Sequence, residues 1–471
     1  MQYYSLQKQS PNIDFRTAAI TGQAPDKGLY FPIELPIFTA AQIENFKTLD
    51  KASLAFEVMR PYVGGTIDDA TLKNICTETI NFDFPLVPIT DTISSLELFH
   101  GPTLAFKDVG ARFMSRCLGY FSKQARAEKA AANNDKPQEH KTQGERPSTV
   151  LVATSGDTGG AVANGFLGVA GVDVIILYPK GKVSLIQELQ LTTLRQNITA
   201  LEVDGSFDDC QAIVKEAFMD GELNAAYNLT SANSINVARW LPQQLYYFFA
   251  WQQWVAKYQD ANGNYPPMHI VVPSGNFGNI CAGMIAKASG LPLGHFVAAC
   301  NANDVVTRYM ATAKYEVKPS VVTISNAMDV GNPSNFVRIL EIMQNNFSTL
   351  SNALTSYSIS DNDTKATIAR VYKTNNYILD PHGAVAFIAA EQFLSEQQVN
   401  NKTISTIEDA LNAGAIILET AHPVKFPEVV EEAIGQVLTI PDSVQDLFEK
   451  EKVSIPLKPN YTAFKNWMLN K

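Results

Sequence analysis

Strand-like and helix-like segments alternate regularly from about residue 149 onwards, and this alternation constrains the fold of the 471-residue chain most strongly. The apolar run TVLVATS is followed by a Gly/Asp turn and the helical stretch TGGAVANGFLGVAG, and MHIVVPSGNFGNICAGMIAKASG repeats strand, glycine-rich turn and helix. HFVAACN and AIILETAHP are later strands. Such alternation predicts an α/β fold with mostly parallel sheets covered on both faces. We expect two α/β domains around a cleft, with ligands outside the carboxyl ends of the strands.

The chain length suggests about three structural units at roughly 150 residues each. We expect an N-terminal unit over residues 1–95, which includes two short amphipathic helices, and α/β domains over 96–240 and 241–471. Residues 122–148 contain no Val, Ile, Leu, Met or aromatic side chain. They cannot bury enough apolar surface to offset their ordering entropy. We expect a helical start that continues from the preceding residues, and then an exposed, mobile insertion loop.

Composition limits the partners. The net charge of −10, from 37 basic and 47 acidic residues, argues against nucleic acid or an anionic membrane. The five cysteines form no CxxC pair, so we expect neither a disulfide framework nor a structural zinc site. No apolar run approaches the roughly 18 residues of a membrane span, and the first residues lack a secretory signal. We therefore expect a cytoplasmic protein.

Two glycine-rich turns stand where a strand gives way to a helix. In PSGNFGN, the glycines let the backbone approach a ligand, and the helix N-terminus that follows suits a phosphate. In ATSGDTGG, Ser155, Thr158 and the adjacent backbone amides can bind a carboxylate. The alternatives are a plain strand-to-helix turn for the first and an ordinary helix N-cap for the second.

Lys107 and Thr420 are two further candidates. Lys107 ends the nearly uncharged run GPTLAFK, which suggests an amine held in a partly desolvated pocket, neutral and nucleophilic. Thr420 lies at the carboxyl end of an apolar strand, where its hydroxyl can meet a ring nitrogen. For each residue an ordinary structural role is the alternative. His382 and His422 have no metal-ligand spacing, so we expect structural histidines and no metal.

Together these segments resemble threonine synthase, a pyridoxal-phosphate enzyme of fold type II related in fold to the tryptophan synthase β chain. The resemblance covers nearly the whole chain, in order and spacing, through the blocks GLYFP, LELFHGPTLAFKD, ATSGDTGGAVA, YPKGKVS, SANSIN, VPSGNFGN, SNAMDV and TAHPVKF. The polar segment 122–148 departs from it as an insertion.

The resemblance implies a role for each candidate. Lys107 would form the Schiff base with pyridoxal 5'-phosphate, and Thr420 would face the pyridine nitrogen. The cofactor phosphate would be held by backbone amides of Gly275, Asn276, Phe277, Gly278 and Asn279. The α-carboxylate of an amino-acid substrate would be received by Ser155, Gly156, Asp157, Thr158 and Gly159, with Thr103 nearby.

The implied reaction is the last step of threonine biosynthesis, catalysed by a carbon–oxygen lyase that acts on phosphates. O-phospho-L-homoserine would lose phosphate by γ-elimination, and water would add at the β-carbon to give L-threonine. The phosphate of the substrate needs its own donors, for which we expect Lys182, Ser184, Asn236 and Arg239. Asn326 and Asp329 are expected to line the site.

Two alternatives stay open on the sequence. A serine/threonine dehydratase would keep the lysine and the phosphate turn without adding water. A non-catalytic homologue that binds the cofactor or a phosphorylated ligand would not need the lysine. For the enzyme we expect a monomer or homodimer.

Overall fold

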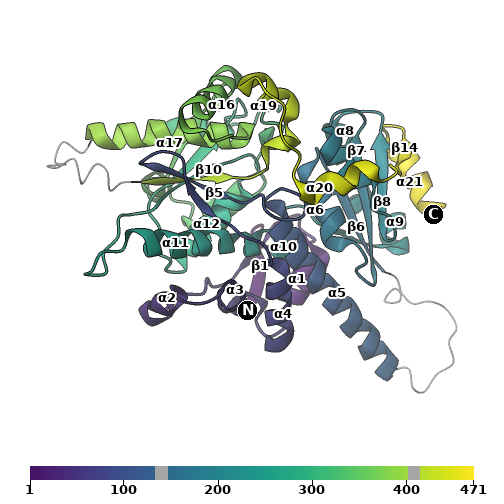
Figure 1. Cartoon of the computed structure of the whole chain (residues 1–471). Helices are drawn as coiled ribbons and strands as arrows, with labels where there is room; N and C mark the ends of the chain where they lie inside the picture. The colour runs from purple at the N-terminus through teal and green to yellow at the C-terminus, as the bar shows by residue number, and fades with distance from the viewer. Residues whose placement is uncertain (133–146, 401–413) are drawn as a thin grey trace.

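The computed structural model describes residues 1–132, 147–400 and 414–471. It contains three sheets, with strand orders β2-β1-β3, β12-β11-β10-β13-β5-β4 and β14-β8-β7-β6-β9. The last two are parallel apart from the β4–β5 pair. The expected α/β architecture with mostly parallel sheets is therefore confirmed (Figure 1).

The N-terminal unit is a small antiparallel sheet with four helices, of which α1 and α4 pack on the long helix α5 (Lys107–Ala132). Its elements are β1 (Gln2–Ser5), β2 (Ile13–Asp14), α1 (Phe15–Thr21), β3 (Tyr30–Pro32), α2 (Ala40–Phe46), α3 (Lys51–Val63) and α4 (Asp69–Thr79). Helices α2 and α3 are the two amphipathic helices predicted from the sequence. Thr39 and Asp50 begin them by accepting backbone N–H bonds at their N-caps.

The five-stranded sheet is covered on both faces. Its strands are β14 (Ile455–Leu457), β8 (Ile198–Val203), β7 (Val172–Pro179), β6 (Ser148–Ala153) and β9 (Asn228–Ser231). The surrounding helices are α5 (Lys107–Ala132), α6 (Asp157–Phe166), α7 (Leu185–Thr192), α8 (Phe207–Met219), α9 (Gly221–Ala226) and α21 (Tyr461–Leu469). Successive residues of β6 belong to different apolar clusters: Val150 and Val152 pack toward α5, and Leu151 toward α8 and α21.

The six-stranded sheet lies on the other side of the molecule (Figure 1). Its strands are β12 (Leu354–Ser358), β11 (Phe296–Cys300), β10 (His269–Pro273), β13 (Ala415–Glu419), β5 (Ile93–Glu97) and β4 (Leu86–Pro88). The helices before its β11 strand are α10 (Val237–Trp240), η1 (Leu241–Gln244), α11 (Leu245–Tyr258) and α12 (Gly278–Ala288). The later helices are α13 (Val305–Thr312), η2 (Asn326–Met328), α14 (Phe336–Ile342), α15 (Phe347–Ala353), α16 (Asp361–Asn375), α17 (Pro381–Asn400), η3 (Pro423–Lys425), α19 (Pro427–Ile434), α20 (Asp442–Gln445) and η4 (Asp446–Glu449).

Both large sheets use strands from across the boundaries expected at residues 95 and 240. Strands β4 and β5 precede Lys107 but pair in the six-stranded sheet, and β14 from the C-terminal segment completes the five-stranded one. The chain therefore crosses between the two sheets several times. The division into three units stays a prediction, and each large sheet contains strands from more than one of those units.

The polar segment 122–148 begins as helix. Helix α5 continues through Ala132, so the expected helical start extends well beyond Phe121. The rest of the expected loop, residues 133–146, lies outside the described residues. None of the described helices combines the length and the apolarity that a membrane span requires.

Candidate active site

A cavity of about 160 Å³ lies where the carboxyl ends of strands from both large sheets converge. Strands β10, β13 and β5 are neighbours, and the residues that follow them bring the 275–279 turn, Thr420 and Lys107 together. The other sheet contributes the turn after β6 and the loop after β9. The cleft predicted from the alternation of strands and helices is therefore present, at the expected ends of the strands.

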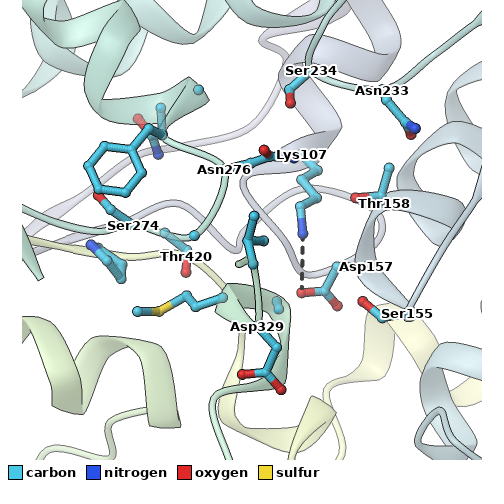
Figure 2. A pocket seen from close by; sticks show the side chains of 18 of the residues that line it. Lys107, Ser155, Asp157, Thr158, Asn233, Ser234, Ser274, Asn276, Asp329 and Thr420 are labelled. Atoms are coloured by element: carbon cyan, nitrogen blue, oxygen red, sulfur yellow. Dashed lines mark ion pairs between the residues drawn. The ribbon is translucent and has the colours of Figure 1, made fainter. Parts of the chain in front are cut away.

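The Lys107 amine is the centre of this cavity. Lys107 is the first residue of α5, and its side chain is 18% exposed. Figure 2 shows its Nζ directed at the Asp157 carboxylate, with Thr420 and Asn276 on one side and Ser155 on the other. Burial lowers the pKa of this amine, Asp157 opposes that shift, and the nearby cations Lys425 and Arg239 reinforce it. The amine is thus biased toward its neutral, nucleophilic form.

The turn after β10 is shaped for close approach. A Cβ on Gly275 would lie 2.7 Å from the Met328 Cα, so only glycine fits against that wall of the cavity. Asn276 is fixed because its Oδ1 accepts bonds from the Ser334 N–H (2.9 Å) and hydroxyl (2.8 Å). The first-turn amides of α12 follow directly, and they have no partners within the helix. This turn can hold a phosphate by its backbone.

The turn after β6 leads into a second helix N-terminus. Gly156 has φ 132° and a Cβ there would lie 2.4 Å from the Gln187 side chain, so the turn requires glycine. Thr154 Oγ1 accepts the N–H bonds of Gly156 (2.9 Å) and Gly159 (2.8 Å), which closes the turn from behind. Ser155, Asp157 and Thr158 line the cavity.

Asp157 is nearly fully buried, and its charge is balanced by cations. Its Oδ1 lies 2.7 Å from the Nζ of the fully buried Lys425, and its Oδ2 lies 4.0 Å from Lys107 Nζ. Burial alone would raise the pKa of this carboxyl. Lys425 and Lys107 outweigh burial and hold the pKa well below its usual range.

Arg239 is a buried cation in the cavity wall with no acidic partner among the described residues. Its Nη1 donates to the Lys107 carbonyl (3.2 Å), and its Nε has no partner in that part of the chain. Burial lowers the pKa of Arg239 to about 10. A buried guanidinium with a free N–H is suited to an incoming anion.

The structure does not bring every predicted residue to the cavity. The residues that do line it are Lys107, Ser155, Asp157, Thr158, Arg239, Gly275, Asn276, Phe277, Gly278, Asn279, Asn326, Asp329 and Thr420. Gly156 and Gly159 donate their backbone N–H groups to Thr154 Oγ1, and Thr103 Oγ1 donates to Asp108. Asn236 caps α10 and donates to the Ala19 carbonyl (2.8 Å), and Lys182 is exposed beside the Ser184 cap of α7. The binding roles remain predictions.

Three residues to which the sequence analysis gave no role in the site line it or contact a residue that does. Met328 forms part of the wall, and Lys425 holds Asp157. His382, expected to be structural, lines the cavity with its buried Nε2 unpartnered among the described residues. Asp380 orients its ring through an Nδ1 contact of 2.6 Å. An isolated histidine carries no such signal in sequence, because its partners come from the fold.

These residues fit pyridoxal phosphate. Two further buried groups in the cavity wall, Asn279 Nδ2 and Arg239 Nε, lack partners in the described part of the chain and can donate to a bound group. A desolvated lysine for the aldehyde, a phosphate turn and a hydroxyl at Thr420 for the ring meet in one cavity.

Comparison with known proteins agrees with this geometry. The family model described as pyridoxal-phosphate dependent enzyme matches residues 95–408, and the models for the threonine synthase N terminus and C-terminal region match residues 2–80 and 384–468. Threonine synthase of Serratia marcescens is 38% identical over 469 residues, covering 100% of this chain and 99% of its own length. The chain belongs to the threonine synthase family.

Solved structures of that family have the same fold. The crystal structure of threonine synthase from Escherichia coli matches with a TM-score of 0.85 and 36% identity over 100% of both chains. The pyridoxal-phosphate-bound threonine synthase from Brucella melitensis matches with a TM-score of 0.85 and 32% identity, over 100% of this chain and 99% of that one. The chain therefore has threonine synthase function, as a lyase with pyridoxal 5'-phosphate as its cofactor. The comparisons therefore support the threonine synthase prediction over the two alternatives, a serine/threonine dehydratase and a non-catalytic homologue.

Proposed function

We propose that this cavity converts O-phospho-L-homoserine and water into L-threonine and phosphate. The observation that carries the proposal is the number of anion sites. Two separate helix N-termini and Arg239, which forms no ion pair among the described residues, line one cavity, whereas the cofactor phosphate alone requires only one such site. A substrate with a carboxylate at one end and a phosphate at the other would use the remaining two.

The cofactor would be held by residues that follow strands of the six-stranded sheet. Lys107 would bind it through Nζ, the backbone of residues 275–279 would receive its phosphate, and the Thr420 hydroxyl would face its ring nitrogen. Bound pyridoxal phosphate supplies an electron sink that makes hydrogens of the substrate acidic. Thr420 carries no charge, so it leaves the protonation of the ring nitrogen open to adjustment.

The α-carboxylate would lie on the turn that runs from Ser155 to Gly159. Its donors are the backbone amides at the start of α6 and the hydroxyls of Ser155 and Thr158, which line the cavity. The Asp157 carboxylate does not compete, because Lys425 and the Gln187 amide (2.9 Å) occupy it. The turn therefore presents donors to the substrate rather than charge of the same sign.

The substrate phosphate would lie against Arg239, which is buried and has a free N–H. Lys182, Ser184 and Asn236 complete the proposed set on the strength of their motifs. Of these, Asn236 is fully buried close to Arg239 in sequence, and Lys182 contributes an exposed charge on the turn before α7.

Lys107 would move protons during the reaction. With the substrate in place, the Lys107 Nζ would accept the α-proton, because burial lowers its pKa. Over the whole reaction the Cγ–O bond breaks and phosphate leaves with its electron pair. Cβ loses one hydrogen and gains the hydroxyl of water, and Cγ gains one hydrogen to become the methyl group of threonine.

The test is product analysis with the purified holoenzyme. O-phospho-L-homoserine should give threonine and phosphate in equal amounts, and L-serine should give little keto acid or ammonia. Arg239→Gln should raise KM for the phosphorylated substrate at least tenfold, because a charge-assisted bond is lost. Arg195→Gln, an exposed arginine paired with Glu451, is the matched control and should not change KM.

Two results would contradict the proposal. One is rapid keto acid formation from serine without threonine from the phosphorylated substrate, which would indicate a dehydratase. The other concerns Lys182→Ala, which should raise KM for the substrate much more than it weakens cofactor binding. Equal losses in both would remove Lys182 from the substrate phosphate site.

A further inference from the structure

A single carboxylate stands between two lysines in this site. Asp157 Oδ1 lies 2.7 Å from Lys425 Nζ, and Oδ2 of the same side chain lies 4.0 Å from Lys107 Nζ. Lys425 is fully buried, and Asp157 is 4% exposed. Closer contact with this carboxylate would stabilise Lys107 as the ammonium ion, because the pair is largely shielded from water.

Lys425 is held in place by contacts on both sides of the cleft. Its Nζ donates to the Thr103 carbonyl (2.9 Å), four residues before Lys107, as well as to Asp157. Gln187 Nε2 donates to Asp157 Oδ1 (2.9 Å), and Gln190 Nε2 donates to the Thr103 carbonyl (3.1 Å). The carboxylate is thus drawn by its Oδ1 toward Lys425 and Gln187, away from the reactive amine.

The other charged and titratable groups near Lys107 are few. Arg239 contacts the Lys107 backbone from α10, and Asp329 and His382 line the same cavity. Asp329 is occupied, because its Oδ1 accepts from Thr323 Oγ1 (2.7 Å). Burial lowers the pKa of Lys107, and Lys425 and Arg239 lower it further against the opposing effect of Asp157. Within residues 1–132, 147–400 and 414–471, Asp157 is therefore the acid whose charge raises the pKa of the reactive amine.

We propose that Lys425 is a positioning residue for Lys107: it binds Asp157 so that this carboxylate does not close on the reactive amine. The inference rests on the proposed role of Lys107 as the cofactor-binding lysine. An amine must be neutral to add to an aldehyde or to accept a proton from carbon. A carboxylate in direct contact with Lys107 would keep it charged and inactive.

Removal of Lys425 should therefore act at a distance on Lys107. In Lys425→Met, which keeps the apolar stem, Asp157 loses its closest cation and the opening of 4.0 Å to Lys107 can close. An opposite charge brought into contact in a buried site favours the protonated form by about one to three pH units. Part of the change is direct, since Lys425 also repels a proton on Lys107.

The experiment uses full-length holoenzyme and reads the visible absorbance of bound pyridoxal phosphate against pH. This absorbance reports whether the nitrogen that joins the cofactor to Lys107 carries a proton. Lys425→Met should raise the midpoint by at least one pH unit, and Lys425→Arg should leave it near that of the unmodified chain. Asp157→Asn should lower it, because the positive charge of Lys425 is then unbalanced.

The double variant separates this role from a general loss of structure. Asp157→Asn with Lys425→Met removes an ion pair that is neutral as a whole, so its midpoint should return to within about half a pH unit of the unmodified chain. Lys365→Met, on the surface and paired with Glu432, is the matched control and should not move the midpoint.

A second measurement follows the rate at which the cofactor-free chain binds pyridoxal phosphate. The cofactor-free chain should capture pyridoxal phosphate at pH 7 about tenfold more slowly for each unit by which the Lys107 pKa rises. An unchanged midpoint in Lys425→Met overturns the proposal, as does a double variant that keeps the midpoint of Asp157→Asn. The second comparison remains available should Lys425→Met alone not fold. A protein that never acquires colour would instead remove the assignment of Lys107.

Discussion

Arg338 is expected to stabilise the fold strongly although it has no acidic partner among the described residues. It is fully buried, and its Nη atoms donate to the Ser234 carbonyl (3.1 Å), Asn335 Oδ1 (2.6 Å), the Tyr30 carbonyl (3.1 Å) and the Ile235 carbonyl (2.6 Å). These acceptors come from the N-terminal unit, from the loop after β9 and from the segment that leads into α14. One side chain therefore joins three parts of the chain.

The magnitude follows from these bonds. Burial lowers the pKa of the Arg338 guanidinium to about 9, so the buried charge itself costs stability. Arg338→Met removes that cost, which offsets part of the stability lost with its hydrogen bonds. The substitution leaves four acceptors, two buried and two partly buried, without this donor, at about 1 kcal/mol each. Loss of the stack on the Trp240 ring, 4.3 Å away, adds a smaller amount. We expect the free energy of unfolding to fall by about 4 kcal/mol.

Urea unfolding of the holoenzyme, followed by tryptophan fluorescence, measures this loss, with Arg195→Met as the exposed control. Cofactor affinity should fall as well, because Asn335, which accepts a bond from Arg338, donates its backbone N–H to the Asn276 carbonyl in the phosphate turn (3.2 Å). A loss below about 1 kcal/mol, as at an ordinary surface position, would refute the reasoning.

Two further predictions concern the phosphate turn and pH. Gly275→Ala should weaken cofactor binding at least tenfold, because the added Cβ would lie 2.7 Å from the Met328 backbone and overpacking typically costs about 1–3 kcal/mol. In the same equilibrium titration the control Gly221→Ala, whose added Cβ meets open space, should bind the cofactor normally. Burial lowers the pKa of His295 to about 4 from about 6.5 in the unfolded chain, so between these pH values the unfolded chain holds the extra proton and the fold loses stability as pH falls. His295→Gln should reduce the pH slope of the free energy of unfolding in that window by up to one proton, and an unaltered slope would show that His295 titrates normally in the fold.

Sequence reasoning predicts the local parts of this site well, because each depends on neighbouring residues. The turns at 155–159 and 275–279 need glycine at positions that the backbone geometry and a close wall dictate, and both lead directly into a helix N-terminus. The alternating strands and helices predict which ends of the strands carry these turns. Such features leave a local pattern in the sequence, so their place in the cavity follows once the fold class is recognised.

The parts that sequence reasoning missed are contacts between distant segments. Lys425 reaches Thr103 across 322 positions, and Arg338 reaches Tyr30 across 308. Likewise, β5 joins the sheet of the later segments, a crossing that no local pattern indicates. Asn236 has a structural role that its motif does not indicate, because its side chain caps α10 and bonds to Ala19; its binding role stays a prediction.

The net charge of the whole chain does not decide which ligand its cavity attracts, because buried charges act locally. The net charge is −10, yet Lys107, Lys425 and Arg239 gather within or behind one cavity wall. Acidic residues spread over the surface are screened by water and salt within about 10 Å, whereas buried cations act at full strength over short distances. Attraction of an anionic ligand is therefore a property of the cavity alone. The same burial that strengthens these cations would make any nearby acid a competitor for the reactive amine, which is why the partner that occupies Asp157 matters to the chemistry.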